Sequence, residues 1–172
     1  MPKPMLKPMA QKATLPAGTR ARSRKAASVS APAMQAWLSV VRTYHLCDAV
    51  MTQRLAGLGL RLPEHEVLVY LLTTPGMSQQ QLAERCFVAK SGVSMLVSRL
   101  VAQGWLQREA DALDARVWRL SLTPEGEALA TQARQMQAEV VSAMTSASSA
   151  AELQALSAAM GQAGQTLEAM LA

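Results

Sequence analysis

The chain has 172 residues, of which half are hydrophobic and only 3% aromatic, and it carries a formal net charge of +5. This length is enough for one domain with a substantial core, and its many Ala and Leu residues favour a mainly helical fold. No apolar run approaches the roughly 20 residues that a transmembrane helix needs, so we expect no integral membrane protein.

Residues 1–31 differ in composition from the rest of the chain. They contain seven basic residues, no acidic residue and four prolines, without a hydrophobic period. Such a segment cannot bury enough apolar surface to offset the entropy of ordering it, so we expect a disordered basic tail. The tail is either a passive arm or an additional attraction for phosphate. The remaining 141 residues carry ten basic and twelve acidic groups, so the positions of their few cations decide which partner they bind.

Helical periodicity begins at Pro32. Apolar residues recur at spacings of three and four up to about residue 60, which predicts one long helix. Pro63 can occupy the first turn of a second helix, and Pro75-Gly76 then turns the chain. The buried face of this second helix is expected to hold Val67, Leu68, Leu71 and Leu72.

Two further helices follow. Ser78 and Gln81 have the spacing of a capping box, which predicts a short helix through Arg85. Another apolar set, ended by Gly104, predicts a helix of about fourteen residues. Its inward face is expected to hold Val93, Leu96, Val97 and Leu100.

The period then changes from helical to alternating. Residues 105–109 and 117–122 are predicted to be strands, joined by a polar turn over residues 111–116. Thr123 can cap a helix that runs to about residue 145, and a last helix is expected over about 150–171. The predicted fold class is therefore mainly α with a small β-hairpin.

The short helix, the longer helix after it and the hairpin have the order of a winged helix-turn-helix, a DNA-binding arrangement. The outward face of the longer helix carries small hydroxyls, a methionine and cations, which suit base edges and phosphates. Arg116 can enter a minor groove from the hairpin, while Asp111 and Asp114 brace it. The candidate DNA contacts are Ser78, Gln79, Lys90, Ser91, Ser94, Met95, Ser98, Arg99 and Arg116.

Four segments together resemble the MarR family of bacterial regulators: Met77 to Arg85, Val93 to Leu106, Asp111 to Arg116, and Leu120 to Gly126. The resemblance extends from about Gln35 to the C-terminus. It implies a cytoplasmic homodimer that binds a palindromic DNA operator, most commonly as a repressor. It further implies dimerisation helices over 32–60 and 123–172 and a DNA-binding lobe over 62–122.

MarR-type regulators commonly respond to small aromatic acids, and a weak general likeness points to nicotinate-type catabolism. A polar ridge on the first helix lies beside its apolar stripe, and aromatic and apolar side chains near it can line a slot. The ridge can equally be a satisfied polar pair at the surface or at a dimer interface. The candidate effector residues are Arg42, Tyr44, His45, Asp48, Met51, His65 and Tyr70.

Three other classes of protein are alternatives. Cys47 and Cys86 lie far apart in helical apolar patterns, which favours buried thiols over a redox-sensing regulator. The chain lacks the nucleophile, nucleotide and H-x-x-x-H motifs of enzymes, so we expect no catalysis, cofactor or metal. A helical dimerisation or adaptor protein without DNA binding explains the long helices but not the hairpin.

Overall fold

The computed structural model describes residues 28–86, 90–114 and 116–171. The predicted basic tail therefore falls almost entirely outside the described residues, as do residues 87–89 between the two helices of the predicted helix-turn-helix. In chain order the elements are α1 (Ala31–Ala56), α2 (Leu62–Thr73), β1 (Met77–Ser78), α3 (Gln79–Arg85), α4 (Lys90–Ala102), β2 (Leu106–Ala110), β3 (Trp118–Leu122), α5 (Pro124–Thr145) and α6 (Ala150–Leu171).

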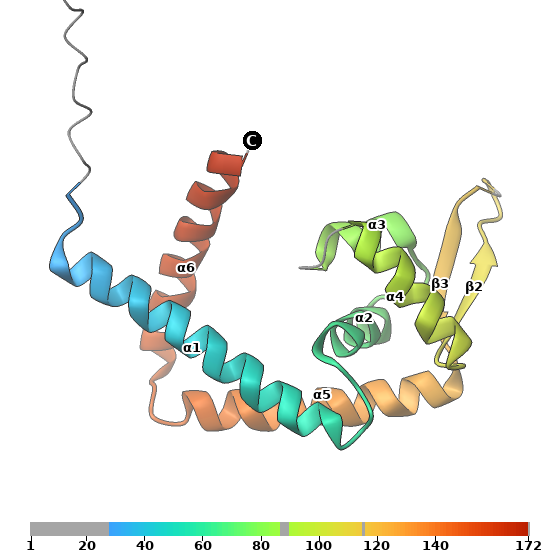
Figure 1. Ribbon diagram of the computed structural model, residues 1–172, viewed down its shortest axis with the longest axis horizontal. Coiled ribbons are helices and arrows are strands. Elements are labelled where there is room, and N and C mark those ends of the chain that lie inside the picture. Colours follow the sequence, from blue (N-terminus) through green and yellow to red (C-terminus); the bar gives the residue numbers. More distant parts are fainter. Residues whose placement is uncertain (1–27, 87–89, 115, 172) are drawn as a thin grey trace, which may run out of the picture.

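The elements form a lobe and an arm (Figure 1). The lobe consists of α2, α3, α4 and the three strands, and it stands on the N-terminal half of α5. The arm consists of α1, which packs along α5, and α6, which rises from the C-terminal end of α5 and stands apart from the lobe. The mainly helical class and the hairpin predicted from the sequence are confirmed.

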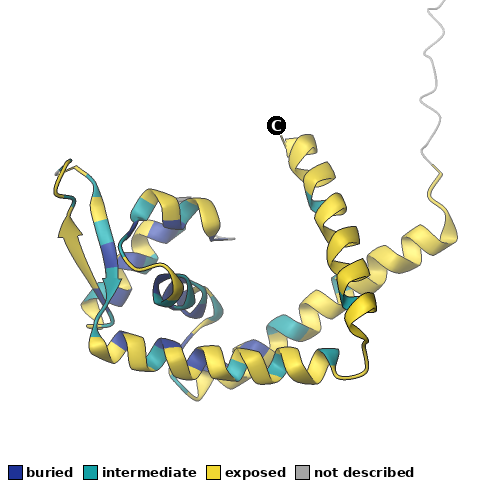
Figure 2. Ribbon diagram, turned by 180° about the vertical axis from the view of Figure 1, so that it is seen from behind, coloured by how far each residue is buried: buried dark blue, intermediate teal, exposed yellow. Residues whose placement is uncertain are grey.

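The core lies within the lobe and where α1 and α5 meet it (Figure 2). In α2, Val67, Leu68 and Leu71 are fully buried, as the periodicity predicts, while Leu72 is half-buried. Each such buried side chain stabilises the fold by about 1.5–3 kcal/mol through removal of apolar surface from water. The largest side chains that are fully buried are Leu55, Val67, Leu68, Leu71, Leu82, Val93, Val97, Leu100, Leu106 and Leu120.

Side-chain caps fix where the helices begin. The Ser78 hydroxyl accepts from the Gln81 amide at 3.1 Å, and the Gln81 side chain accepts from the Ser78 amide at 2.9 Å. The predicted capping box is therefore present. The Thr123 hydroxyl accepts from the Gly126 amide at 3.1 Å, so α5 starts as predicted. These bonds satisfy amides that the first helical turn leaves without partners.

The sheet is larger than the predicted hairpin. Its order is β1-β3-β2, all antiparallel, with Leu106 opposite Leu122 and Met77 opposite Leu120. The sequence does not predict the two-residue strand β1, because two residues show no alternation. The strand predicted at 105–109 begins at Leu106 instead, since the Trp105 amide donates to the Leu100 carbonyl and closes α4.

The arm buries little within one chain. Met51 and Leu55, in the last turns of α1, are its buried residues, and α6 has none. Figure 2 shows α6 and the outer half of α1 exposed along their length. Among the described residues, every helix is too short or too polar to cross a membrane.

Candidate functional site

The outward face of α4 is polar and accessible. Ser94 and Ser98 are exposed on this face, and Met95 between them is 74% exposed. The opposite face packs into the core through Val93 and Val97. Lys90 and Ser91 belong to the first turn of α4, but their side chains lie outside the part of the chain that the structure describes. The outward face thus carries small side chains around one methionine, which allows another molecule to approach the helix closely.

The N-terminus of α3 contributes less than expected to this surface. Ser78 and Gln79 are half-buried, and the Ser78 hydroxyl is already engaged in the helix cap. A hydroxyl that accepts a cap hydrogen bond can still donate its own proton. The Ser78 hydroxyl therefore keeps its donor, while the cap uses one of its two acceptor lone pairs.

Arg99 does not extend freely from α4. Its Nη1 donates to Oε1 of Glu64 in α2 at 3.2 Å. Arg61 Nη2 donates to the same oxygen at 2.9 Å, and the Glu64 side chain is only 3% exposed. A buried carboxylate needs such partners, because desolvation without them costs several kcal/mol. Arg99 therefore joins α4 to α2, a role that its place beside the outward face does not suggest.

Arg116 stands out from the hairpin, and its direction is set by Asp114. Its Nε and Nη2 donate to the two Asp114 oxygens, each at 3.0 Å, and its backbone amide also donates to Oδ1 at 3.0 Å. The guanidinium lowers the pKa of Asp114, and Asp114 in turn raises the pKa of Arg116. The Arg116 side chain remains 91% exposed. A fixed cation thus projects into solvent beside the strands.

Asp111 supports a different arginine from the one expected. Its Oδ2 accepts from Nε of Arg119 at 2.6 Å, and its Oδ1 accepts from the amides of Leu113 and Asp114. These bonds, led by the Leu113 amide, lower the pKa of Asp111. The sequence pattern predicts only that Arg119 lies on the polar side of a strand. The pairing of Glu109 with Arg119 across the hairpin is what brings Arg119 near Asp111.

The expected effector residues do not form one pocket in the single chain. Arg42, Tyr44 and His45 are exposed on α1, whereas Met51 belongs to the core. Asp48 is half-buried, and the Tyr70 hydroxyl donates to the Arg85 carbonyl at 3.1 Å. The seven side chains separate because α1 meets the lobe only through its C-terminal turns.

His65 is the one member of that set that lies buried in α2. It is 4% exposed, and its Nδ1 has no hydrogen-bond partner among the described residues. Burial lowers the pKa of His65, and a hydrogen bond with Gln137 partly opposes this. The neutral ring is therefore favoured at neutral pH, which does not suit it to bind a carboxylate.

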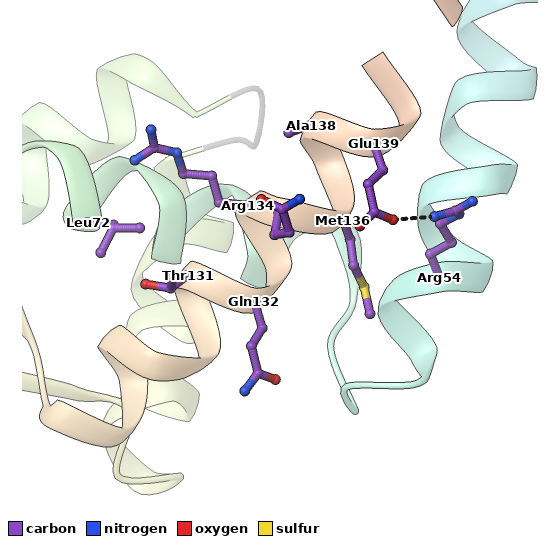
Figure 3. Close-up of a pocket in the computed structure, with 9 residues that line it drawn as sticks. Arg54, Leu72, Thr131, Gln132, Arg134, Met136, Ala138 and Glu139 are labelled. Carbon is purple, nitrogen blue, oxygen red and sulfur yellow. Dashed lines mark hydrogen bonds and ion pairs between the residues drawn. The ribbon is translucent and has the colours of Figure 1, made fainter. Parts of the chain in front are cut away.

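An open groove of about 960 Å³ runs along α5 between α1 and α2 (Figure 3). Arg54 of α1 donates to Glu139 of α5 at 3.0 Å across it, and Arg134 lies toward Leu72. The lining residues are Arg54, Leu72, Thr131, Gln132, Arg134, Gln135, Met136, Ala138 and Glu139. None of the seven expected effector residues lines it.

The two thiols are free, with Cys47 half-buried and Cys86 buried. Burial, with a smaller contribution from Glu66, raises the pKa of Cys86 to about 11. Because the thiolate is the reactive form, Cys86 is a poor redox sensor. Within the described residues no three His, Cys, Asp or Glu side chains are grouped so as to hold a metal ion.

Comparison with known proteins relates part of the chain to one family. Residues 58–117, which run from the connection before α2 to the residue before β3, match the model of the MarR family. The match covers about a third of the chain, so the lobe of this chain is similar to that of the MarR family. An HTH-type transcriptional repressor of Mycobacterium tuberculosis is 34% identical over 79 residues, which are 46% of this chain and 57% of that protein.

Solved structures of MarR-type regulators share the fold of the arm and the lobe. AbsC of Streptomyces coelicolor superposes with a TM-score of 0.75 and 22% identity, covering 83% of this chain and 99% of that one. FabT of Streptococcus pneumoniae, solved in complex with DNA, gives a TM-score of 0.69 at 16% identity, covering 80% and 98%. The chain spans only 57–60% of the length of the curated relatives that it matches.

Proposed function

We propose that this protein is a sequence-specific DNA-binding transcriptional regulator of the repressor type, and not an enzyme. The observation that carries the proposal is the exposed, oriented guanidinium of Arg116 beside the accessible polar face of α4. Relatives named as HTH-type regulators and repressors, and a neighbour in fold that was solved with DNA, support it. Such a protein acts where the chromosome is, in the bacterial cytoplasm.

The two surfaces suit the two grooves of DNA. The α4 face can lie in the major groove, where Ser94 and Ser98 exchange hydrogen bonds with base edges and Met95 contacts a thymine methyl group. Lys90 and Ser91, by their place in the first turn, are proposed to join them. Arg116 is proposed to enter the adjacent minor groove, whose negative potential attracts an arginine.

We further propose that the protein is a homodimer that binds a palindromic operator. The arm exposes more large apolar side chains than an isolated soluble chain usually does. On α1, Trp37 is 59% exposed, and on α6 Leu156 and Leu167 are similarly exposed. A two-fold axis through these arms presents two lobes to two half-sites.

A small aromatic acid is the proposed effector, with a nicotinate-type catabolite as one candidate. The groove along α5 supplies the opposite charge, since Arg134 stands on its wall beside the apolar Leu72. It also lies between the arm and the lobe, so a ligand there can alter the angle between them. The residues expected from the sequence, Arg42, Tyr44 and His45, remain exposed and available on α1.

A gel shift with the DNA upstream of the protein's own gene tests the proposal. The protein is expected to shift this duplex more tightly than a scrambled one. Arg116→Ala is expected to weaken operator binding by about 1–3 kcal/mol. Arg54→Ala, compared in the absence of any effector, is the matched control, because Arg54 is a half-exposed arginine whose ion pair joins α1 to α5 and does not involve the hairpin.

Two results contradict the proposal. Equal binding of the upstream and scrambled duplexes contradicts sequence-specific recognition, and normal binding by Arg116→Ala contradicts the proposed contact between Arg116 and the minor groove. Light scattering of the same sample tests the dimer, which a stable species near 18.4 kDa, the mass of one chain, at micromolar concentration contradicts. Absence of any DNA binding by a folded dimer supports the adaptor alternative.

A further inference from the structure

A continuous chain of hydrogen bonds connects the turn before α3 to the exposed arginine of the hairpin. Arg119 Nη1 donates to the Gly76 carbonyl at 3.3 Å, and Arg119 Nε donates to Asp111 at 2.6 Å. Asp111 accepts from the Asp114 amide at 3.1 Å, and Asp114 holds Arg116. The direction of Arg116 is thus linked to the middle of the lobe.

Arg119 has a rigid base for this role. It lies on β3, the central strand, with Ser78 of β1 opposite it on one side and Glu109 of β2 on the other. The Gly76 amide also donates to the Leu120 carbonyl at 3.0 Å, which fixes the turn to the same strand. Because the backbone of Arg119 is already ordered by strands on both sides, holding its side chain costs little additional conformational entropy.

Asp111 connects Arg119 to the hairpin turn. Its side chain is only 14% exposed, and both carboxylate oxygens accept hydrogen bonds. The Arg119 guanidinium holds one oxygen, so the other stays directed at the Leu113 and Asp114 amides. Hydrogen bonds between charged groups are roughly twice as strong as neutral ones, which suits this bond to fix the turn.

We propose that Arg119 is a positioning residue for DNA binding, which acts through Asp111 and Asp114 to hold Arg116 ready for the groove. The proposal rests on the DNA-binding function proposed above. Without Arg119, Asp111 rotates more freely, its bonds to the Leu113 and Asp114 amides weaken, and Arg116 must be ordered on binding. Ordering a long side chain at an interface lowers affinity, whereas one ordered in advance avoids that cost.

A direct contact between Arg119 and a phosphate is the competing role, and the two roles predict different results. Nε and Nη1 of Arg119 are already engaged within the protein, so a positioning role leaves the number of phosphate contacts unchanged. If Arg119 neutralised a phosphate directly, its replacement would lower the slope of log affinity against log salt by about 0.9. The two roles also differ in whether the effect passes through Arg116.

The test is a set of gel-shift titrations at several salt concentrations, with the upstream duplex and a scrambled duplex. The variants are Arg119→Gln, Arg116→Ala and the double variant. Arg119→Gln is expected to weaken binding of the upstream duplex about three- to tenfold, within the range of coupling between contacting residues, with an unchanged salt slope. In the Arg116→Ala background it is expected to have no further effect.

Glu109→Gln is the matched control, because Glu109 faces Arg119 across the hairpin but lies outside the chain of hydrogen bonds. It is expected not to weaken binding. Thermal unfolding of Arg119→Gln is expected to stay close to that of the unaltered protein, since the Arg119 side chain is partly exposed. A loss of affinity without a loss of stability separates positioning from a merely structural role.

A spectroscopic measurement without DNA makes the inference independent of the proposed function. The Nε–H resonance of Arg116 in ¹⁵N-labelled protein is expected to be sharp and slowly exchanging, and to broaden in Arg119→Gln but not in Glu109→Gln. An unchanged resonance in Arg119→Gln, normal affinity of that variant, an additive loss in the double variant or a reduced salt slope each overturns the positioning role. Failure of the unaltered protein to bind its upstream DNA, with the resonance behaving as expected, overturns the proposed function instead.

Discussion

Replacing Gly126 with alanine tests how closely the lobe is joined to α5. Gly126 is buried in the first turn of the helix, and its amide donates to the Thr123 hydroxyl at 3.1 Å. Thr123 in turn donates to the Gly104 carbonyl at 2.6 Å and, from its amide, to the Trp105 carbonyl at 3.1 Å. A Cβ at residue 126 would lie 2.0 Å from the Trp105 carbonyl oxygen and 2.8 Å from its carbonyl carbon.

The magnitude follows from what must move. The atoms in the way belong to the backbone and cannot rotate aside, so α5 must shift away from the lobe. Overpacking of this kind costs about 1–3 kcal/mol, and weakening of one of the bonds at Thr123 adds about 1 kcal/mol. The better helix propensity of alanine returns up to about 1 kcal/mol. We expect a net loss of about 1–4 kcal/mol, or roughly 2–16 °C in melting temperature for a chain of this size.

Calorimetry or circular dichroism at matched protein concentration measures this loss. Gly57→Ala is the control, because Gly57 has a right-handed φ of −64° and its added Cβ would meet only the Arg54 carbonyl at 3.4 Å. It is expected to leave stability unchanged or to raise it by up to about 1 kcal/mol through the unfolded state. If Gly126→Ala and Gly57→Ala have the same melting temperature, α5 does not approach the Trp105 backbone closely enough to exclude a methyl group.

Three more predictions concern charge and ionisation. The pKa of Cys86 is about 11 in the folded protein but near 9 in the unfolded chain, so as pH rises the unfolded chain loses this proton first. The contribution of Cys86 to the free energy of unfolding is therefore lost as pH rises from 9 to 11. Alkylation of native Cys86 at pH 8 is therefore expected to be about a hundredfold slower than that of the denatured chain, and comparable rates contradict its burial. Glu64→Gln is expected to lower the free energy of unfolding by about 1–3 kcal/mol, more than Arg99→Gln, since removing Arg99 still leaves Arg61 on the carboxylate; denaturant titrations compare the two. Deleting residues 1–27 is expected to lower the slope of log affinity against log salt by about 0.9 for each phosphate that the tail neutralises. The preference for the upstream duplex is expected to survive. An unchanged slope would mean that the tail has no role in DNA binding.

Local signals in the sequence are enough to predict most of the helices. The apolar spacing of α4 and the caps at Ser78 and Thr123 act over a few residues, so the pattern alone determines where these elements begin and which face is buried. The pairing of Asp114 with Arg116 is equally local. The resemblance to the MarR family is found over residues 58–117, because the motifs that carry it lie mostly in the lobe.

Contacts between distant residues are beyond such signals. Glu64 and Arg99 are 35 positions apart, and nothing in either helix indicates that they meet. Arg119 acquires its role from the pairing of β3 with two other strands, one of which is only two residues long. Tyr44 and Met51 are two turns apart on one face of α1, but the structure buries Met51 and exposes Tyr44, since packing on the lobe ends partway along the helix. Tertiary packing decides each of these cases.

Because the arm is exposed in a single chain, the stability of the protein and its occupancy of DNA are expected to depend on protein concentration. Helix α6 has 22 residues and buries none of them within its own chain, so little but its own hydrogen bonds holds it together there. Most of the stability of a helix in a protein comes from packing of one of its faces, so in the proposed dimer the association of two arms supplies much of the stability of α6. By mass action, the melting temperature then rises with protein concentration. A lone protomer presents a single Arg116 and a single α4, whereas the proposed dimer would bring two lobes to one stretch of DNA. When most protomers are unpaired, occupancy of an operator varies with the square of their concentration, and a modest fall in protein level releases the DNA sharply.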